Sequence, residues 1–338
     1  MVKPQPVRIT IGAVGDLMCH VPQLEAAKQP DGSYAFDSVF TDIAPLIAAP
    51  DFMIGNLETV LAGEKANGYT GYPNFNTPDT YAAAMQRTGF DVLTTANNHS
   101  FDRDEPGVLR TLDVLDSLKI PHTGTARTAA ARDSLLIVDV KGIRLGILAY
   151  TYGINGNRLP KTKEYLINFI DTALVKKDVE RMNLLPAAQR PDKIIACIHW
   201  GREYKPQPDE AQRILAGQLF TLGVDIIFGA HPHVIQPAER KIVVRGNALA
   251  LCFIIYSMGN FVSAQRTKPR DTGAMVFIGL EKNFETGTTS ITETSFIPTY
   301  VHLSKENQKP KFQVLPVPQT ISKLATQPAL LPEKVKLR

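Results

Sequence analysis

The chain has 338 residues, of which 44% are hydrophobic and 21% are charged, and it carries a formal net charge of +4. These values are ordinary for a soluble globular protein and allow one large α/β domain, with or without an appended piece. Lysine and arginine are scattered rather than clustered, which argues against nucleic-acid binding. No apolar run is long enough to cross a bilayer; the longest, over residues 248–256, is far too short.

The cysteines and the first residues bear on the cellular compartment. Cys19, Cys197 and Cys252 are odd in number and far apart, so we expect no disulfide framework. Residues 1–6 lead almost directly into a predicted strand and leave no room for a signal peptide. We therefore expect either a cytoplasmic protein or one whose leader was removed before the numbering begins.

The first two thirds of the chain alternate between predicted strands and helices, as in a parallel sheet. The strands are short runs rich in β-branched residues, over 7–14, 51–55, 90–95, 193–198 and 224–228. The helices have apolar residues at helical spacing, over 36–49 with a break at Pro45, 78–88, 106–118, 171–184 and 208–222. Residues 63–78 are predicted to form a long loop, and 134–150 a hairpin that turns at Lys141-Gly142.

Beyond Gln236 the pattern changes to strands separated by short turns, which is typical of antiparallel pairing. These strands are predicted over 241–244, 249–256, 274–280 and 289–296. From residue 304 the chain is proline-rich and basic, and we expect an extended segment that wraps the domain or stays mobile. We therefore divide the chain into a domain over 7–303 and an extension over 304–338.

Five predicted strands end on side chains that can bind a metal ion. These side chains are Asp16, Glu58, Asn98 with His99, His199, and His231 with His233. Open α/β sheets bind ligands at the carboxyl ends of their strands, and the long, irregular spacing argues against a structural zinc-finger site. Oxygen and imidazole ligands favour manganese, iron or zinc. Six ligands exceed the needs of one catalytic ion, so two ions about 3.5–4 Å apart are expected.

Each of these residues also has a purely structural alternative. Asp16 could cap a following helix, and Glu58 could pair with a surface lysine. Asn98 could occupy a left-handed turn, and His199 could be a hydrogen-bonded core histidine. A shared site is the better interpretation because all of these groups follow the ends of strands.

The same strand ends carry motifs that resemble those of the CapA family. They are Gly15-Asp16, Gly55-Asn56-Leu57-Glu58, Asn97-Asn98-His99, His199-Trp200-Gly201, Gly229-Ala230-His231-Pro232-His233 and Ser257-Met258-Gly259-Asn260-Phe261. CapA is the poly-gamma-glutamate (capsule) synthesis protein family, a branch of the calcineurin-like metallophosphatase superfamily. The resemblance covers roughly residues 8–265 and implies a four-layered α/β/β/α sandwich with the metal site at the strand ends.

The resemblance also implies a role for each residue. The metal ligands would be Asp16 and His233 for the first ion, Glu58 as the bridging carboxylate, and Asn98, His199 and His231 for the second ion. His99 matches the histidine that donates a proton to the leaving group, and Asp102 is placed to orient it. The sequence departs from the superfamily at Met18, where a histidine is usual; His20 lies two residues further on. Occupancy by one ion or by two is therefore left open.

These residues predict metal-assisted hydrolysis of a phosphoryl or acyl centre, with His99 as general acid. Arg202 and Glu203 could hold the substrate or form an exposed loop pair. Asn260 faces the same end of the sheet, where it could bind the substrate or serve a turn. The resemblance implies an anionic envelope polymer such as poly-gamma-glutamate as substrate, an extracytoplasmic or envelope location, and a polymer-synthesis complex as partner. The alternative is a non-catalytic accessory component with a degenerate metal site, which Met18 favours.

Overall fold

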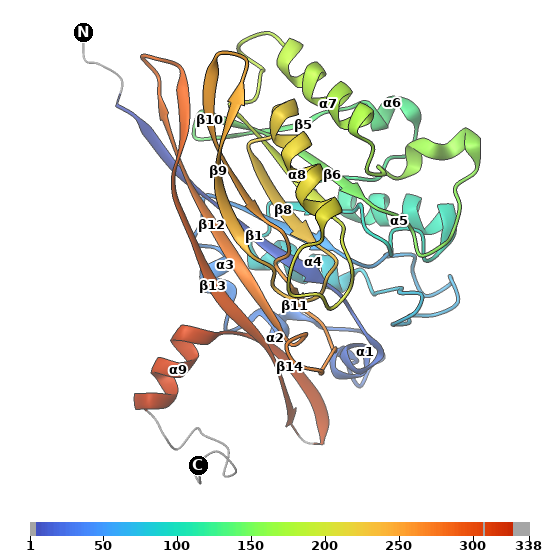
Figure 1. Ribbon diagram of the computed structural model, residues 1–338. Coiled ribbons are helices and arrows are strands. Elements are labelled where there is room, and N and C mark those ends of the chain that lie inside the picture. The colour runs from blue at the N-terminus through green and yellow to red at the C-terminus, as the bar shows by residue number, and fades with distance from the viewer. Residues whose placement is uncertain (1–4, 307, 327–338) are drawn as a thin grey trace.

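The computed structural model describes residues 5–306 and 308–326 (Figure 1). Two β-sheets pack face to face, and helices cover the outer face of each sheet. This is the four-layered α/β/β/α arrangement that the sequence predicts. No helix in the described part of the chain is both long enough and apolar enough to cross a lipid bilayer.

The first sheet has eight strands and is parallel in one half and antiparallel in the other. In spatial order its strands are β14 (Lys309–Pro316), β13 (Thr288–Glu306), β12 (Thr272–Asn283), β1 (Val7–Leu17), β2 (Phe52–Leu57), β3 (Val92–Thr94) and β4 (His122–Thr123). The short strand β11 (Asn260–Val262) pairs in parallel with the end of β1. Strands β1 to β4 run parallel, so their carboxyl ends meet at one edge.

The second sheet has six strands. Its order is β5 (Leu136–Val140), β6 (Ile143–Thr151), β7 (Lys193–His199), β8 (Ile226–Ala230), β10 (Ala248–Ile255) and β9 (Ala238–Arg245). The central strands are parallel, and an antiparallel hairpin closes each edge. The hairpin predicted at Lys141-Gly142 is present, and both turn residues have positive φ, as a tight two-residue turn requires.

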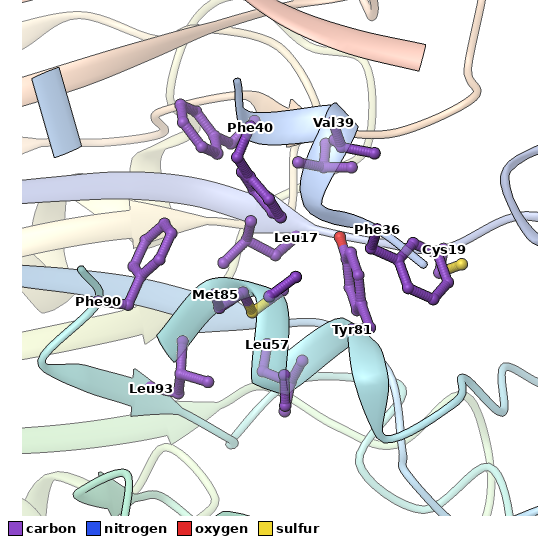
Figure 2. Packing of buried hydrophobic residues seen from close by; sticks show 14 of the residues in the cluster. Leu17, Cys19, Phe36, Val39, Phe40, Leu57, Tyr81, Met85, Phe90 and Leu93 are labelled. Carbon is purple, nitrogen blue, oxygen red and sulfur yellow. The ribbon is translucent and has the colours of Figure 1, made fainter. Parts of the chain in front are cut away.

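The helices fall into two groups by the sheet they cover. The first sheet packs against α1 (Val21–Ala27), α2 (Asp37–Phe40), α3 (Ala44–Ile47), α4 (Thr80–Thr88) and the end of α5 (Asp104–Ser117). Figure 2 shows part of this layer, where Tyr81 and Met85 of α4 pack toward Leu17 of β1. The second sheet packs against α7 (Thr172–Leu184) and α8 (Glu210–Leu222). The remaining helices are α6 (Ala129–Arg132), α9 (Val317–Thr326) and the 3₁₀ helix η1 (Lys161–Leu166).

The elements predicted in the first two thirds of the chain are confirmed, with bounds that shift by a few residues. The helix predicted over 36–49 is two short helices, α2 and α3, because Pro45 starts a new turn. Antiparallel pairing in the last third is confirmed for β9 with β10 and for β12 to β14, but β10 also pairs in parallel with β8. Helix α1 was not predicted.

The proline-rich end continues the first sheet rather than leaving it. Residue 304 lies inside β13, and β14 follows as the edge strand. An edge strand tolerates Pro310 and Pro316 because only one of its sides must donate hydrogen bonds. Helix α9, which begins at Val317, was not predicted, and residues 327–338 lie outside the described residues.

Candidate metal centre

The predicted ligands come from both sheets and meet at their shared carboxyl edge. Asp16 lies in β1 and Glu58 directly follows β2, both in the first sheet. His199 ends β7, and His231 and His233 follow β8, all in the second sheet. Each of these five side chains is no more than 3% exposed, so they meet in the interior between the sheets.

Two glycines allow the strands around the site to approach closely. A Cβ atom on Gly15 would lie 2.0 Å from the backbone oxygen of Gly259, which accepts a hydrogen bond from the Asp16 N–H at 3.0 Å. A Cβ atom on Gly229 would lie 1.9 Å from the backbone oxygen of Tyr256. Both approaches exclude any side chain at these positions. The glycines of the Gly15-Asp16 and Gly229-Ala230-His231 motifs therefore position the ligands that follow them.

The ligand atoms form two overlapping groups in the described part of the chain. One group contains Asp16, Glu58 and His199, and the other contains Glu58, His231 and His233; within each, the atoms lie within 4.8 Å of one another. Glu58 is common to both, and its Oε1 lies 3.7 Å from His199 Nε2 and 3.8 Å from His233 Nε2. A carboxylate in this position can bridge two cations.

The hydrogen bonding of these groups fits a divalent cation. Both carboxylate oxygens of Glu58 and Nδ1 of His231 are buried without a hydrogen-bond partner among the described residues. Unpartnered buried polar atoms are rare because desolvation costs free energy that no hydrogen bond repays. A cation would satisfy all three atoms at once, and the oxygen–imidazole donor set suits manganese, iron or zinc.

The pKa values of the two buried carboxyl groups are shifted in opposite directions. Burial and the charge of Asp16 raise the pKa of Glu58 well above its usual value. Burial also acts to raise the pKa of Asp16, but the hydrogen bond and charge of His233 outweigh it and leave that pKa below its usual value. Nδ1 of His233 lies 2.9 Å from Asp16 Oδ2. Asp16 is therefore ionised, whereas Glu58 needs a nearby cation to lose its proton.

The imidazoles of His199 and His231 are neutral at physiological pH and so are ready to bind a metal. Burial and the neighbouring His233 lower the pKa of His231 to about 3. Burial and the neighbouring His231 lower the pKa of His199 well below its usual value. A histidine binds a metal only in its neutral form, so these two ligands lose nothing to proton competition at physiological pH.

Four asparagines surround this cluster and hold its members. Oδ1 of Asn98 lies 2.8 Å from His199 Nε2, and the Asn98 amide donates to Asn155 at 3.0 Å. The Asn56 amide donates to Asp16 Oδ1 at 2.9 Å. Oδ1 of Asn260 lies 3.0 Å from Nδ1 of His233. Asn260 is fully buried next to this ligand histidine, and its contact with the substrate stays a prediction.

His99 and Asp102 form a second buried unit beside the ligands. His99 Nδ1 lies 2.7 Å from Asp102 Oδ2, and that oxygen also accepts the Phe75 N–H at 2.6 Å. The ring of Phe75 packs edge-on against the His99 ring at 4.6 Å. Asp102 therefore fixes the orientation of His99, as its position in the sequence predicts.

Arg202 and Glu203 lie in the exposed loop that follows β7. The Arg202 side chain is 78% exposed and its Nε lies 3.9 Å from Asp209, which agrees with the alternative of an exposed loop residue. Glu203 is also exposed, and its charge contributes to the raised pKa of Glu58. A substrate contact of either residue stays a prediction.

Tyr152 is a site residue that the sequence analysis missed. Its ring lies 4.5 Å from the ring of His231 and is 48% exposed, so it covers the ligands on the solvent side. Burial raises its pKa to about 12, and its hydroxyl is therefore neutral at physiological pH. Tyr152 directly follows β6, so the strand-end rule that located the ligands would also have found it.

Met18 and His20 lie next to the cluster without joining it. The Met18 backbone oxygen accepts the Tyr81 hydroxyl at 3.0 Å. His20 caps α1 and packs edge-on against Phe75 at 5.1 Å. Neither belongs to a group of metal-binding atoms among residues 5–306 and 308–326. His20 therefore does not supply the ligand that is missing at position 18.

Comparisons with known proteins agree with this geometry. The family model of the bacterial capsule synthesis protein PGA_cap matches residues 10–265. The capsule biosynthesis protein CapA of Bacillus anthracis is 28% identical over 297 residues, which cover 83% of this chain and 68% of that protein. The PGA biosynthesis protein CapA of Bacillus subtilis (strain 168) is 29% identical over 273 residues, 80% of this chain and 67% of that protein.

Among solved structures, a phosphatase from Mycoplasma pneumoniae is similar with a TM-score of 0.50 and 14% sequence identity, over 87% of this chain and 94% of that one. At this identity the likeness shows the fold alone. The two chains therefore share their two-sheet architecture.

Proposed function

Because this chain belongs to the bacterial capsule synthesis protein PGA_cap family, we propose that it is a metal-dependent hydrolase acting on an anionic substrate of capsule metabolism. The reaction is the cleavage of a phosphoester or an acyl bond by water. The observation that carries the proposal is the buried Glu58 carboxylate, whose two oxygens lack a hydrogen-bond donor in the described residues while imidazoles flank it.

Six side chains would hold the metal: Asp16, Glu58, Asn98, His199, His231 and His233. Two ions, of manganese, iron or zinc, fit this number of ligands, with Glu58 between them. Bound divalent cations supply Lewis acidity, which polarises the oxygens of the scissile group and lowers the pKa of a water molecule. The surrounding asparagines fix the ligands in place, as the partners of metal-binding histidines commonly do.

His99 is the general acid of the proposed reaction. The Asp102 carboxylate lies 2.7 Å from Nδ1 of His99, which leaves Nε2 as the atom that carries the transferable proton. The negative charge of Asp102 stabilises the protonated imidazole before transfer to the leaving group. Because the Phe75 N–H also holds Asp102, the orientation of the acid does not depend on the substrate.

A non-catalytic role is the second candidate, and Met18 is the observation that favours it. A histidine at this position would add a ligand to the first ion, and the buried Met18 does not replace it. In this case the chain would bind an anionic polymer such as poly-gamma-glutamate within a synthesis or export complex. In both candidate functions, the names of the two Bacillus relatives support an anionic polymer as the molecule that the chain binds.

The test combines metal content with turnover. Elemental analysis of protein purified without chelators measures bound metal, and bis(p-nitrophenyl) phosphate and gamma-linked glutamate oligomers serve as substrates in added Mn²⁺. We expect His99→Gln to keep the metal and to lose turnover by about 100-fold or more. His122→Gln is the control, because His122 is not a predicted site residue and its Nε2 lies 3.8 Å from the exposed Asp116 carboxylate. Bound polymer without turnover of either substrate would establish the accessory role instead.

A further inference from the structure

We propose that Arg270 is the residue that binds the anionic group of the substrate, a carboxylate or a phosphate next to the scissile bond. This assignment rests on the proposed function of the site and names the chemistry that the substrate must carry. Arg202, the residue that the sequence favours for this role, has a side chain that is 78% exposed.

Tyr204 connects Arg270 to the metal ligands. The guanidinium carbon of Arg270 lies 3.3 Å from the centre of the Tyr204 ring, and that ring lies 6.1 Å from the ring of His233. Tyr204 is fixed in turn, since its N–H donates to the backbone oxygen of Pro232 at 2.7 Å. The guanidinium is thus separated from a predicted ligand by a single aromatic ring.

The backbone of Arg270 is tied to the same histidine by another route. The Asn260 amide donates to the backbone oxygen of Arg270 at 2.8 Å, and Oδ1 of Asn260 lies 3.0 Å from His233 Nδ1. Both ends of residue 270 are therefore fixed relative to the metal centre before a substrate arrives. Such preorganisation increases affinity because less conformational entropy is lost on binding.

The guanidinium has free hydrogen-bonding capacity. Arg270 is half-buried, and the described residues provide no carboxylate partner for it; the contact of its side chain is the Tyr204 ring. An arginine stacked on an aromatic face keeps its N–H groups available along the edge of the guanidinium plane. This edge matches the two oxygens of a carboxylate or phosphate. A cation without a counter-ion beside the site favours an anionic ligand there.

The experiment compares three charge-removing variants of the metal-loaded protein. Arg270→Met tests the proposal, Arg202→Met tests the residue favoured by sequence, and Lys268→Met removes the same charge from an exposed position in the same loop. Calorimetry measures the binding of inorganic phosphate and of a gamma-linked glutamate oligomer, and steady-state kinetics measures KM and kcat for p-nitrophenyl phosphate. Elemental analysis checks that each variant keeps its metal.

We expect Arg270→Met to weaken anion binding by about 10- to 100-fold and to raise KM by a similar factor with little change in kcat. Arg202→Met and Lys268→Met should change binding by less than about threefold, as rim charges do. A loss confined to phosphate assigns Arg270 to a phosphate group, and a loss confined to the oligomer assigns it to a carboxylate. Arg270→Lys should bind more tightly than Arg270→Met but less tightly than the wild type, because lysine keeps the positive charge and lacks the planar guanidinium that makes two parallel hydrogen bonds.

The proposal is overturned if Arg270→Met binds both anions as the wild type does, or if Arg202→Met shows the loss instead. The binding measurement does not require turnover. If no substrate is hydrolysed by the wild type, the hydrolase function fails while calorimetry still decides the role of Arg270.

Discussion

Replacing Glu58 by glutamine tests the metal centre most directly, because the substitution keeps the shape of the side chain and removes its charge. In the metal-free protein the carboxylate is fully buried and its pKa is raised well above 4.5 by burial and by Asp16. The folded state therefore keeps a proton that the unfolded state releases. Relative to Glu58→Gln, the stability of the metal-free wild type should fall as pH rises above 4.5, until pH reaches the folded-state pKa.

The linkage between ligand binding and folding gives the size of two effects, the pH dependence of stability and the stabilisation by metal. Without metal, the wild type loses up to about 1.4 kcal/mol per pH unit in this window relative to Glu58→Gln, and the histidines cancel because they titrate in both proteins. Asp16 contributes below pH 3.8, outside the window. With metal at about 100 times its Kd, the wild type gains about 2.7 kcal/mol. An unfolding entropy of about 2.1 cal/mol/K per residue over 338 residues makes this a Tm increase of about 4 °C.

The assay is thermal unfolding of chelator-treated and Mn²⁺-loaded protein at several pH values between 5 and 8. We expect Glu58→Gln to be more stable than the wild type without metal and to gain little when metal is added. Glu293→Gln, at an exposed position, should follow the wild type within about 0.5 kcal/mol. Equal responses of the wild type and Glu58→Gln to metal would refute the reasoning, because the carboxylate would then not contribute to cation binding.

Three further predictions concern the groups around the ligands, and a fourth provides a control in helix α8. Asp102→Asn should lower turnover by about 100-fold or more with metal content unchanged, since His99 loses the charge that stabilises its protonated form; normal turnover would contradict this. Asn260→Ala should weaken metal binding by about 10- to 100-fold in a chelator competition, and an unchanged affinity would count against its positioning role. Gly15→Ala should destabilise the fold by about 1–3 kcal/mol or more in denaturant titrations, because its Cβ would meet a backbone oxygen at 2.0 Å. Gly217→Ala in helix α8, where a Cβ meets nothing within 4 Å, should stabilise by about 1 kcal/mol.

The architecture was largely predictable because hydrophobic periodicity is a local property. Strands β1, β2, β3, β7 and β8 and the helices between them follow from alternating runs of apolar residues and from proline and glycine at their ends. Parallel strands then require their carboxyl ends to meet at one edge. That rule places Asp16 and Glu58 at the edge of one sheet and the histidines at the edge of the other. The packing of the two sheets then brings Asp16 to His233, 217 positions further along the chain.

The loops around the centre were not predictable in the same way. Arg202 follows a ligand histidine in the chain, yet its side chain is 78% exposed and its Nε lies 3.9 Å from Asp209. Arg270 lies in a different loop and reaches the site through the ring of Tyr204.

The sequence by itself therefore determined which strands exist and which ligands stand at their ends, since both depend on neighbours along the chain. Only the tertiary structure decided which side chains face the substrate. Outside regular strands, the direction of a side chain depends on backbone torsions that contacts between distant loops select.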